Sequence, residues 1–149
     1  MSKSHSSSYQ DKIEDLSTIL HFSKPELPFG ELSNFWNLSI PLLFNGKKYK
    51  TSEHAYQSAK FLYEGNNLAS MELAELIRNQ TTPYKAKILT MVNPPNRYLW
   101  QEHLCFEVNR FRQMGAMIRP DWENVKIEVM YNIVRAKFSQ DKHCRDVLL

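Results

Sequence analysis

An Asn-Gly pair at positions 45 and 46 constrains the fold of this chain more strongly than any other short segment. It separates two stretches, 38–44 and 47–50, and this arrangement is the strongest short-range signal for a β-hairpin. Pro41 has no backbone N–H, so the first strand must lie at the edge of a sheet or carry a bulge. The second stretch leads directly into Thr51-Ser52, whose hydroxyls can cap a helix. The sequence therefore predicts a hairpin followed at once by a helix.

Helical patterns dominate the rest of the chain. After the helix at Thr51-Ser52, we expect helices at 68–78, from Thr82-Pro83 to a break at 93–96, at 97–114, and from Asp121 onward, with one more strand at 19–22. These elements predict an α+β fold, mainly helical, that forms a single domain with a small antiparallel sheet. We expect the domain to cover residues 19–149 and the polar residues 1–18 to be a disordered tail.

The composition is that of one soluble domain. The chain has 149 residues, 42% of them hydrophobic, and a formal net charge of +3, which suits an anionic small molecule or a nucleic acid. No apolar run approaches the roughly 20 residues that cross a membrane. Without a secretory signal, we expect a cytoplasmic location and no membrane partner. Cys105 and Cys144 are expected to be free thiols, and the histidine and cysteine spacings indicate no metal site.

Glu53, Gln57 and Lys60 form a polar strip on the helix that begins at Thr51-Ser52. Residues separated by four and three positions are neighbours on a helix, so an acid, an amide and a cation face one direction. Such a set could bind a polar, phosphate-bearing ligand and exchange a proton with it. From the spacing alone, solvated surface charges remain the simpler explanation.

Other candidate residues have similarly plain explanations. His54 is more simply a packed or capping histidine than a catalytic one, and Asp121 more simply a helix cap than an acid. Trp122 is predicted to anchor the last helix in the core, although it could also stack on a flat ligand. Arg97-Tyr98-Leu99-Trp100 and Arg110-Phe111-Arg112 interleave basic and aromatic residues as single-strand binders do, yet core packing explains most of these aromatics.

Two motifs are more specific than these local patterns. They are Gly30-Glu31-Leu32-Ser33-Asn34-Phe35 and the Glu-His-x-x-Gln-x-x-Lys-Phe pattern of residues 53–61. Other segments follow in order, and they are Phe44-Asn45-Gly46-Lys47, Pro83-Tyr84-Lys85-Ala86-Lys87, Arg119-Pro120-Asp121-Trp122, and residues 135–140 and 145–149. From about residue 19 to the end, the chain resembles the NADAR family in the order and spacing of these segments.

The resemblance implies an N-glycosidase that cleaves a ribose–nitrogen bond without a metal or cofactor. The implied substrates are phosphoribosylamino intermediates of riboflavin biosynthesis or ADP-ribose attached to guanine, including ADP-ribosylated nucleic acid. By the same resemblance, Glu53, Lys60 and Asp121 are expected to be catalytic, and the substrate-binding residues are expected to be Asn34, Phe35, Gln57, Lys87 and Trp122.

The chemistry of glycosidic cleavage suits these residue types. A carboxylate can stabilise an oxocarbenium-like transition state or activate water, and the leaving nitrogen needs a proton. A lysine with a lowered pKa could instead attack the opened sugar and form a Schiff base. The sequence leaves both routes open.

Two departures from the family pattern lead to further expectations. Family members continue beyond the equivalent of Leu148-Leu149 with further motifs, so we expect a C-terminally truncated domain and a partner chain that supplies the missing segment. The stretch 88–118 is longer than in compact members. The alternatives are a degenerate module that binds ADP-ribose or a nucleotide without cleaving it, and a nucleic-acid-associated protein.

Overall fold

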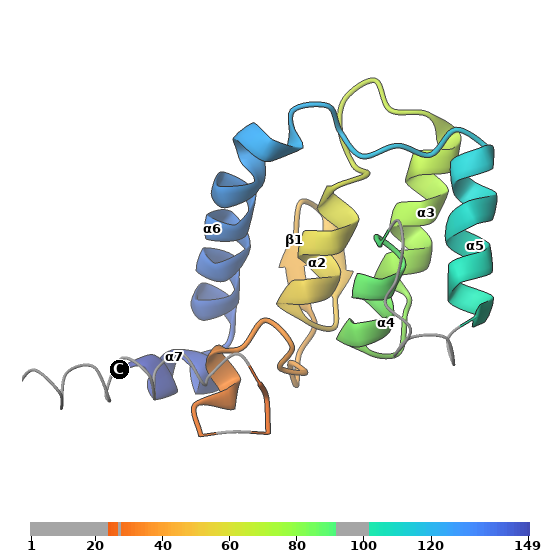
Figure 1. The fold of residues 1–149 in the computed structure, drawn as a ribbon. Helices are drawn as coiled ribbons and strands as arrows, with labels where there is room; N and C mark the ends of the chain where they lie inside the picture. The colour runs from red at the N-terminus through yellow and green to blue at the C-terminus, as the bar shows by residue number, and fades with distance from the viewer. Residues whose placement is uncertain (1–23, 27, 92–101) are drawn as a thin grey trace, which may run out of the picture.

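The structure is a computed structural model that describes residues 24–26, 28–91 and 102–149. The predicted tail at 1–18, the predicted strand at 19–22 and the segment 97–100 lie outside these ranges, as does the side chain of Cys105. The described part is mainly helical and contains a two-stranded antiparallel sheet, which confirms the predicted fold class. Figure 1 shows the central helix α2 (Ser52–Ala59) in front of this sheet, with α6 (Trp122–Gln140) on one side. On the opposite side lie α3 (Leu68–Arg78), α4 (Pro83–Ile88) and α5 (Glu102–Gln113).

The predicted hairpin is present, with strands β1 (Leu42–Phe44) and β2 (Lys47–Tyr49). Leu42 pairs with Tyr49 and Phe44 with Lys47. Asn45 and Gly46 have φ values of 48° and 79°. These left-handed conformations are those that a two-residue hairpin turn requires, and Asn and Gly adopt them most readily.

The first strand is shorter than the stretch 38–44 predicted for it because it begins just after Pro41. Its free edge is bound by a side chain. The Gln140 amide accepts a hydrogen bond from the N–H of Leu43 at 2.8 Å and donates one to its carbonyl at 2.7 Å. The end of α6 thus takes the place of a third strand at this position.

Helix α2 begins where the sequence predicts. Thr51 lies just before it with extended backbone, and its side-chain oxygen accepts a hydrogen bond from the N–H of His54. This confirms Thr51 as the cap. His54 is fully buried and bonded to Thr51, as expected for a packed histidine.

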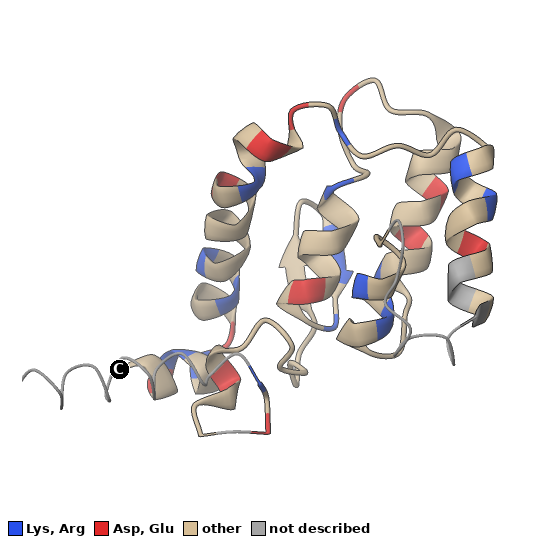
Figure 2. Ribbon diagram, viewed as in Figure 1, with Lys and Arg blue, Asp and Glu red and all other residues tan. Residues whose placement is uncertain are grey.

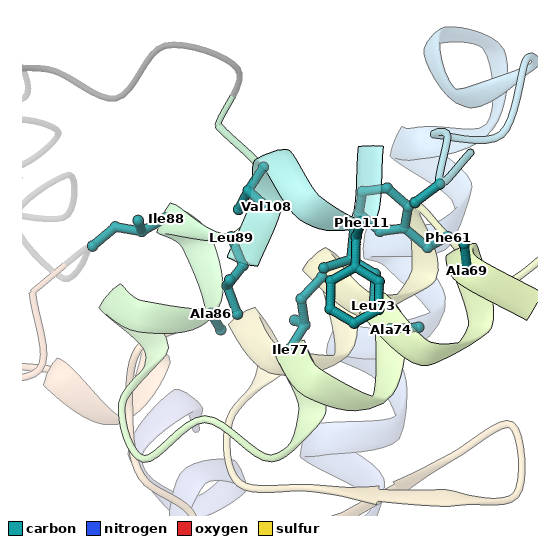
Figure 3. Close-up of a cluster of buried hydrophobic side chains, with 11 residues drawn as sticks. Phe61, Ala69, Leu73, Ala74, Ile77, Ala86, Ile88, Leu89, Val108 and Phe111 are labelled. Carbon is teal, nitrogen blue, oxygen red and sulfur yellow. The ribbon is translucent and has the colours of Figure 1, made fainter. Parts of the chain in front are cut away.

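The larger core lies between α2 and the helices α3 (Leu68–Arg78), α4 (Pro83–Ile88) and α5 (Glu102–Gln113). Leu73 and Ile77 of α3 are fully buried at its centre, and Phe111 of α5 packs on them (Figure 3). A second core joins the hairpin, α2 and α6 through residues that include Leu42, Ala55 and Ile133. Helix α2 is therefore held from both sides.

The helix predicted from Pro83 to the break at 93–96 is too long. Helix α4 ends at Ile88, where the Thr90 hydroxyl donates to the carbonyl of Lys87 at 2.8 Å and the chain makes a tighter turn.

Asp121 also differs from the prediction that it caps α6. It immediately precedes α6, but its carboxylate makes no capping hydrogen bond because it is paired with Arg119.

A separate short helix, α7 (Lys142–Leu148), follows α6 and was missed by the sequence patterns. The extended Asp141 lies between the two helices, and its carboxylate accepts the N–H of Cys144 at 2.9 Å. Helix α7 packs against a 3-10 turn, η2 (Gly30–Leu32), near the C-terminal end of α6 (Figure 1). The segment that follows η2 is thereby held close to α6.

Within the described ranges, no helix combines the length and hydrophobicity needed to span a membrane. The same residues contain no group of three or more His, Cys, Asp or Glu side chains placed to hold a metal ion.

Candidate functional site

Glu53 and Gln57 are buried on α2, with exposed fractions of 6% and 4%. The ordinary solvated helix face that the spacing allowed is therefore excluded for these two residues. The Gln57 amide donates to Glu53 Oε1 at 2.6 Å, which fixes the carboxyl group. Gln57 Oε1 is also buried, and among the described residues it has no hydrogen-bond partner. A buried acceptor without a partner costs about 1–3 kcal/mol, so it is well suited to receive a ligand's donor.

Burial is the main influence on the ionisation of Glu53. It raises the pKa of this carboxyl above 4.5, against the opposing effects of the Gln57 hydrogen bond and of the Lys87 and Lys60 charges. A carboxyl group with a raised pKa retains a proton at higher pH than an exposed one and can deliver it to a substrate.

Lys60 follows α2 directly and lies beside two aromatic rings. Its Nζ is 5.6 Å from the ring centre of Tyr56 and 5.8 Å from that of Trp122, and the two rings are 5.1 Å apart. Burial lowers the pKa of Lys60, while the charge of Glu53 partly restores it. The acid and the amine are thus shifted towards each other in proton affinity, a pattern concentrated at functional sites.

Asn34 and Phe35 reach the site on a turn that follows η2. The Asn34 carbonyl accepts the N–H of Glu53 at 3.0 Å, which joins this turn to the first turn of α2. The Asn34 amide also approaches the sulfur of Met130 on α6, at 3.6 Å. On the other side, the ring of Phe35 meets Tyr84 of α4 edge to face, with 4.6 Å between ring centres.

Lys87 contributes positive charge from α4. Its side chain is exposed, and its charge acts on both Glu53 and Lys60. Figure 2 shows the acidic position of α2 between basic positions on α4 and α6. These positive charges would attract an anionic group of a ligand.

Asp121 and Trp122 reach this region in different ways. Trp122 is buried, as predicted for a core anchor, and its ring faces Lys60. The Asp121 carboxylate is half-exposed and held by Arg119, with 2.7 Å between Oδ1 and Nε and 2.9 Å between Oδ2 and Nη2. This pairing lowers the pKa of Asp121 and keeps it ionised. The N–H of Arg119 donates to the Lys60 carbonyl at 2.8 Å, which connects this turn to the end of α2.

Several neighbours of these residues were not predicted from the sequence as members of the site. They are Tyr56, Tyr84, Lys126 and Met130, placed there by the contacts given above and by the charge of Lys126 near Lys60. One signal was available in the sequence. Tyr84 precedes Lys87 by three positions, so the two side chains lie on the same face of α4.

Two cavities flank α2. An open, apolar cavity of about 490 Å³ is lined by Tyr56, Lys126, Met130 and further residues of α6. It lies next to the Glu53 cluster, by which we mean Glu53, Gln57 and Lys60. A more enclosed cavity of about 370 Å³ lies between the hairpin, α2 and α6, where Ala55 and Ala59 line it. Glu53 lines neither of these two cavities, so the apolar one offers room beside the acid and not around it.

The model of the NADAR domain family matches residues 21–149 of this chain. The chain belongs to the NADAR domain family. It is 30% identical to N-glycosidase YbiA of Escherichia coli (strain K12) over 132 residues, which cover 89% of this chain and 64% of YbiA. It is 31% identical to the chloroplastic riboflavin biosynthesis protein PYRR of Zea mays over 136 residues, which cover 88% of this chain and 19% of PYRR.

The NMR structure of Escherichia coli YbiA has a similar fold, with a TM-score of 0.50 and 28% sequence identity. The match covers 84% of this chain and 56% of the YbiA chain. This likeness confirms the predicted resemblance and fold for this NADAR domain. The chain spans less than two-thirds of the length of YbiA in both comparisons.

Proposed function

We propose that this NADAR domain hydrolyses the bond between a ribose carbon and a nitrogen in a phosphoribosylamino or ADP-ribosyl compound. The observation that carries the proposal is the buried pair of Glu53 and Gln57, flanked by the cations Lys60 and Lys87. A carboxyl with a raised pKa, a fixed amide and nearby cations are what proton delivery to a phosphorylated N-glycoside requires. The relationship to a protein named N-glycosidase supports the same reaction class.

In the reaction we propose, protonated Glu53 donates its proton to the leaving nitrogen as the carbon–nitrogen bond breaks. The bonding electrons go to the nitrogen, and the ribose carbon becomes oxocarbenium-like. Water then adds to this carbon and returns a proton to the Glu53 carboxylate. The Gln57 amide suits both states, because its N–H can donate to a carboxylate and its oxygen can accept from a carboxylic acid.

Lys60 offers the alternative route. Burial lowers its pKa, which increases the fraction of neutral amine available to attack the aldehyde of the opened ribose. Reduction with borohydride during turnover separates the two routes. It would trap a covalent adduct on wild-type protein only if a Schiff base forms, and Lys60→Met would abolish that adduct.

We propose substrate contacts from the side chains that surround Glu53. Asn34 and Gln57 would bind ribose hydroxyls, and Lys87 a phosphate. Phe35, with Tyr84, and Trp122, with Tyr56, would pack against the flat parts of the ligand. For Asp121 we propose an electrostatic role through Arg119, since its lowered pKa makes it a poor proton donor.

The alternative is a module that binds the nucleotide without cleaving it, and the absence of Glu53 from the lining of either cavity favours this alternative. Ile127 and Tyr131, which line the apolar cavity on α6, are 79% and 63% exposed. We therefore include in the proposal that further polypeptide, on a partner chain or on this one, completes the wall beside the Glu53 cluster. ADP-ribosylated nucleic acid as a substrate and a cytoplasmic location stay predictions.

The test is to incubate the purified chain with guanine-linked ADP-ribose and with the phosphoribosylamino intermediate of the riboflavin pathway. Base or amine release is measured by chromatography. We expect Glu53→Gln to lower the rate by about 10²–10⁴-fold, the usual contribution of a general acid. Glu72→Gln is the matched control, because Glu72 is exposed on α3.

Equal rates for wild type and Glu53→Gln would refute the assignment of the acid. If wild type releases nothing but binds ADP-ribose in calorimetry, the binding-module alternative replaces the enzyme. If it neither cleaves nor binds any of these compounds, both proposals are wrong.

A further inference from the structure

Lys137 on α6 is the largest of the fully buried side chains, with an exposed fraction of 1%. Its Nζ donates a hydrogen bond to the backbone carbonyl of Ser33, 2.9 Å away and 104 residues earlier in the chain. The ring of Phe138 lies 5.4 Å from the same nitrogen. The ammonium group is therefore placed at one backbone atom of the segment that carries Asn34 and Phe35.

Stability alone does not account for a lysine at this position. No carboxylate among the described residues forms an ion pair with it, although Cys144, Asp141 and Glu31 act on it electrostatically at longer range. Burial dominates over these charges and lowers the pKa of Lys137. A methionine has a similar volume and would fill the space without the cost of removing an ammonium from water. We therefore look for the reason for this cation in the hydrogen bond that its ammonium group donates.

The Ser33 carbonyl is the closing atom of a tight turn. It also accepts the N–H of Trp36 at 3.2 Å, so Asn34 and Phe35 occupy the two central positions. The Ser33 hydroxyl accepts the N–H of Phe35 at 3.1 Å. Within the turn, the Asn34 carbonyl accepts the N–H of Glu53 and so joins the turn to α2.

We propose that Lys137 is a positioning residue for the site: it holds the turn of residues 33–36 on α6 and so fixes Asn34 and Phe35 beside Glu53. The inference rests on the proposed function only in giving Asn34 and Phe35 a ligand to bind. Lys137 itself is buried beneath the turn and needs no contact with that ligand.

The test compares Lys137→Met with Lys142→Met, which removes an exposed lysine of α7 instead. Amide hydrogen exchange is followed by NMR at Trp36, whose N–H closes the turn, and at Glu53, whose N–H joins the turn to α2. We expect Lys137→Met to speed exchange at these two amides by roughly 10- to 100-fold, the loss of one charged hydrogen bond. Thermal stability should stay equal or rise, since a buried charge is replaced by an apolar side chain.

Ligand binding supplies a second readout. Lys137→Met should weaken ADP-ribose binding or raise KM more than it lowers kcat, because Glu53 itself is untouched. Lys142→Met should match wild type in both measurements. A merely structural role would predict lower thermal stability together with a general increase in exchange across α6. That result, or unchanged exchange at Trp36 and Glu53, overturns the proposal.

If Lys137→Met does not fold, the wild-type protein still decides the question. A protonated side chain held in a buried hydrogen bond gives a slowly exchanging ¹⁵N-bound ammonium signal. We expect such a signal for Lys137, with a nuclear Overhauser contact to the Trp36 N–H, which shares the Ser33 carbonyl as its acceptor. Its absence at low temperature and mildly acidic pH would overturn the proposal. Because the exchange and ammonium measurements require no activity, failure of the proposed function leaves them interpretable.

Discussion

His54 provides the most quantitative test of how this fold depends on pH. Its ring is fully buried, and both ring nitrogens are bonded. Nε2 lies 2.8 Å from the carbonyl of Gln80, which can only accept, so this nitrogen carries the proton. Nδ1 lies 2.8 Å from the Thr51 hydroxyl, which already accepts the backbone N–H of His54. Burial disfavours a charged ring, so Nδ1 carries no proton and accepts the hydrogen of the Thr51 hydroxyl, and the ring is neutral in one tautomer.

Protonation of His54 would put a hydrogen on Nδ1, where it would face the hydrogen of the Thr51 hydroxyl. Burial, with a smaller effect from Lys50, lowers the pKa of the folded-state ring below 6.5. The unfolded chain binds this proton at its ordinary pKa, so stability falls as the pH drops below about 6.5. The loss is about 1.4 kcal/mol per pH unit until the folded-state pKa is reached. Between pH 6.5 and pH 5 this slope limits the loss to about 2 kcal/mol.

Urea unfolding at about pH 7.5 and pH 5 measures this loss in wild type and in His54→Gln. For each protein, we take the decrease in the free energy of unfolding between the two pH values. The decrease in wild type is then compared with the decrease in His54→Gln. Glu53 contributes in the opposite direction, because its raised pKa favours the folded state as the pH falls, and this contribution largely cancels in the difference. His143→Gln is the control, since the His143 side chain is 66% exposed.

We expect His54→Gln to lose less free energy of unfolding than wild type between these pH values, by at most about 2 kcal/mol, and His143→Gln to follow wild type. If His54→Gln shows the same loss as wild type, the neutral buried ring is not the source of the acid sensitivity. The assignment of the Thr51–His54–Gln80 hydrogen bonds would then be wrong as well.

Three further substitutions test the packing. Leu73→Ala should lower the free energy of unfolding by about 2–5 kcal/mol in urea titrations, because it leaves a hole at the centre of the larger core. Leu68→Ala, at a position 67% exposed, should change it by less than about 0.5 kcal/mol, and equal effects would contradict the core assignment. Gly30→Ala should lower the melting temperature measurably, since a Cβ at this position would lie 2.0 Å from the Pro25 carbonyl oxygen. An unchanged melting temperature would show that this close approach is not required.

Much of the local structure follows from the sequence because its causes are local. The Asn45-Gly46 turn depends on the backbone freedom of two residues, and the Thr51 cap on a hydroxyl three residues from its donor. The break between α6 and α7 escaped prediction because the capping carboxylate of Asp141 lies within a continuous polar stretch. The early end of α4 likewise depends on a single hydroxyl, that of Thr90.

The candidate site was only partly predictable. Helical spacing placed Glu53, Gln57 and Lys60 on one face, but it gave no means of deciding whether that face met water or protein. The packing of Asn34 and Phe35 over the start of α2 depends on contacts between distant parts of the chain. Tyr84 and Met130 come from α4 and α6, so no pattern within α2 could indicate them.

The sequence by itself determined that this chain forms a hairpin, a capped helix and further helices, and its motifs identified the NADAR family. Short-range backbone preferences and ordered motifs are sufficient for those conclusions. Only the tertiary structure decided that Glu53 is buried beside an amide, that Lys60 lies beside two aromatic rings, and that Lys137 reaches the Ser33 carbonyl. Ionisation depends on burial and on neighbouring charges, and both are set by residues far apart in the chain.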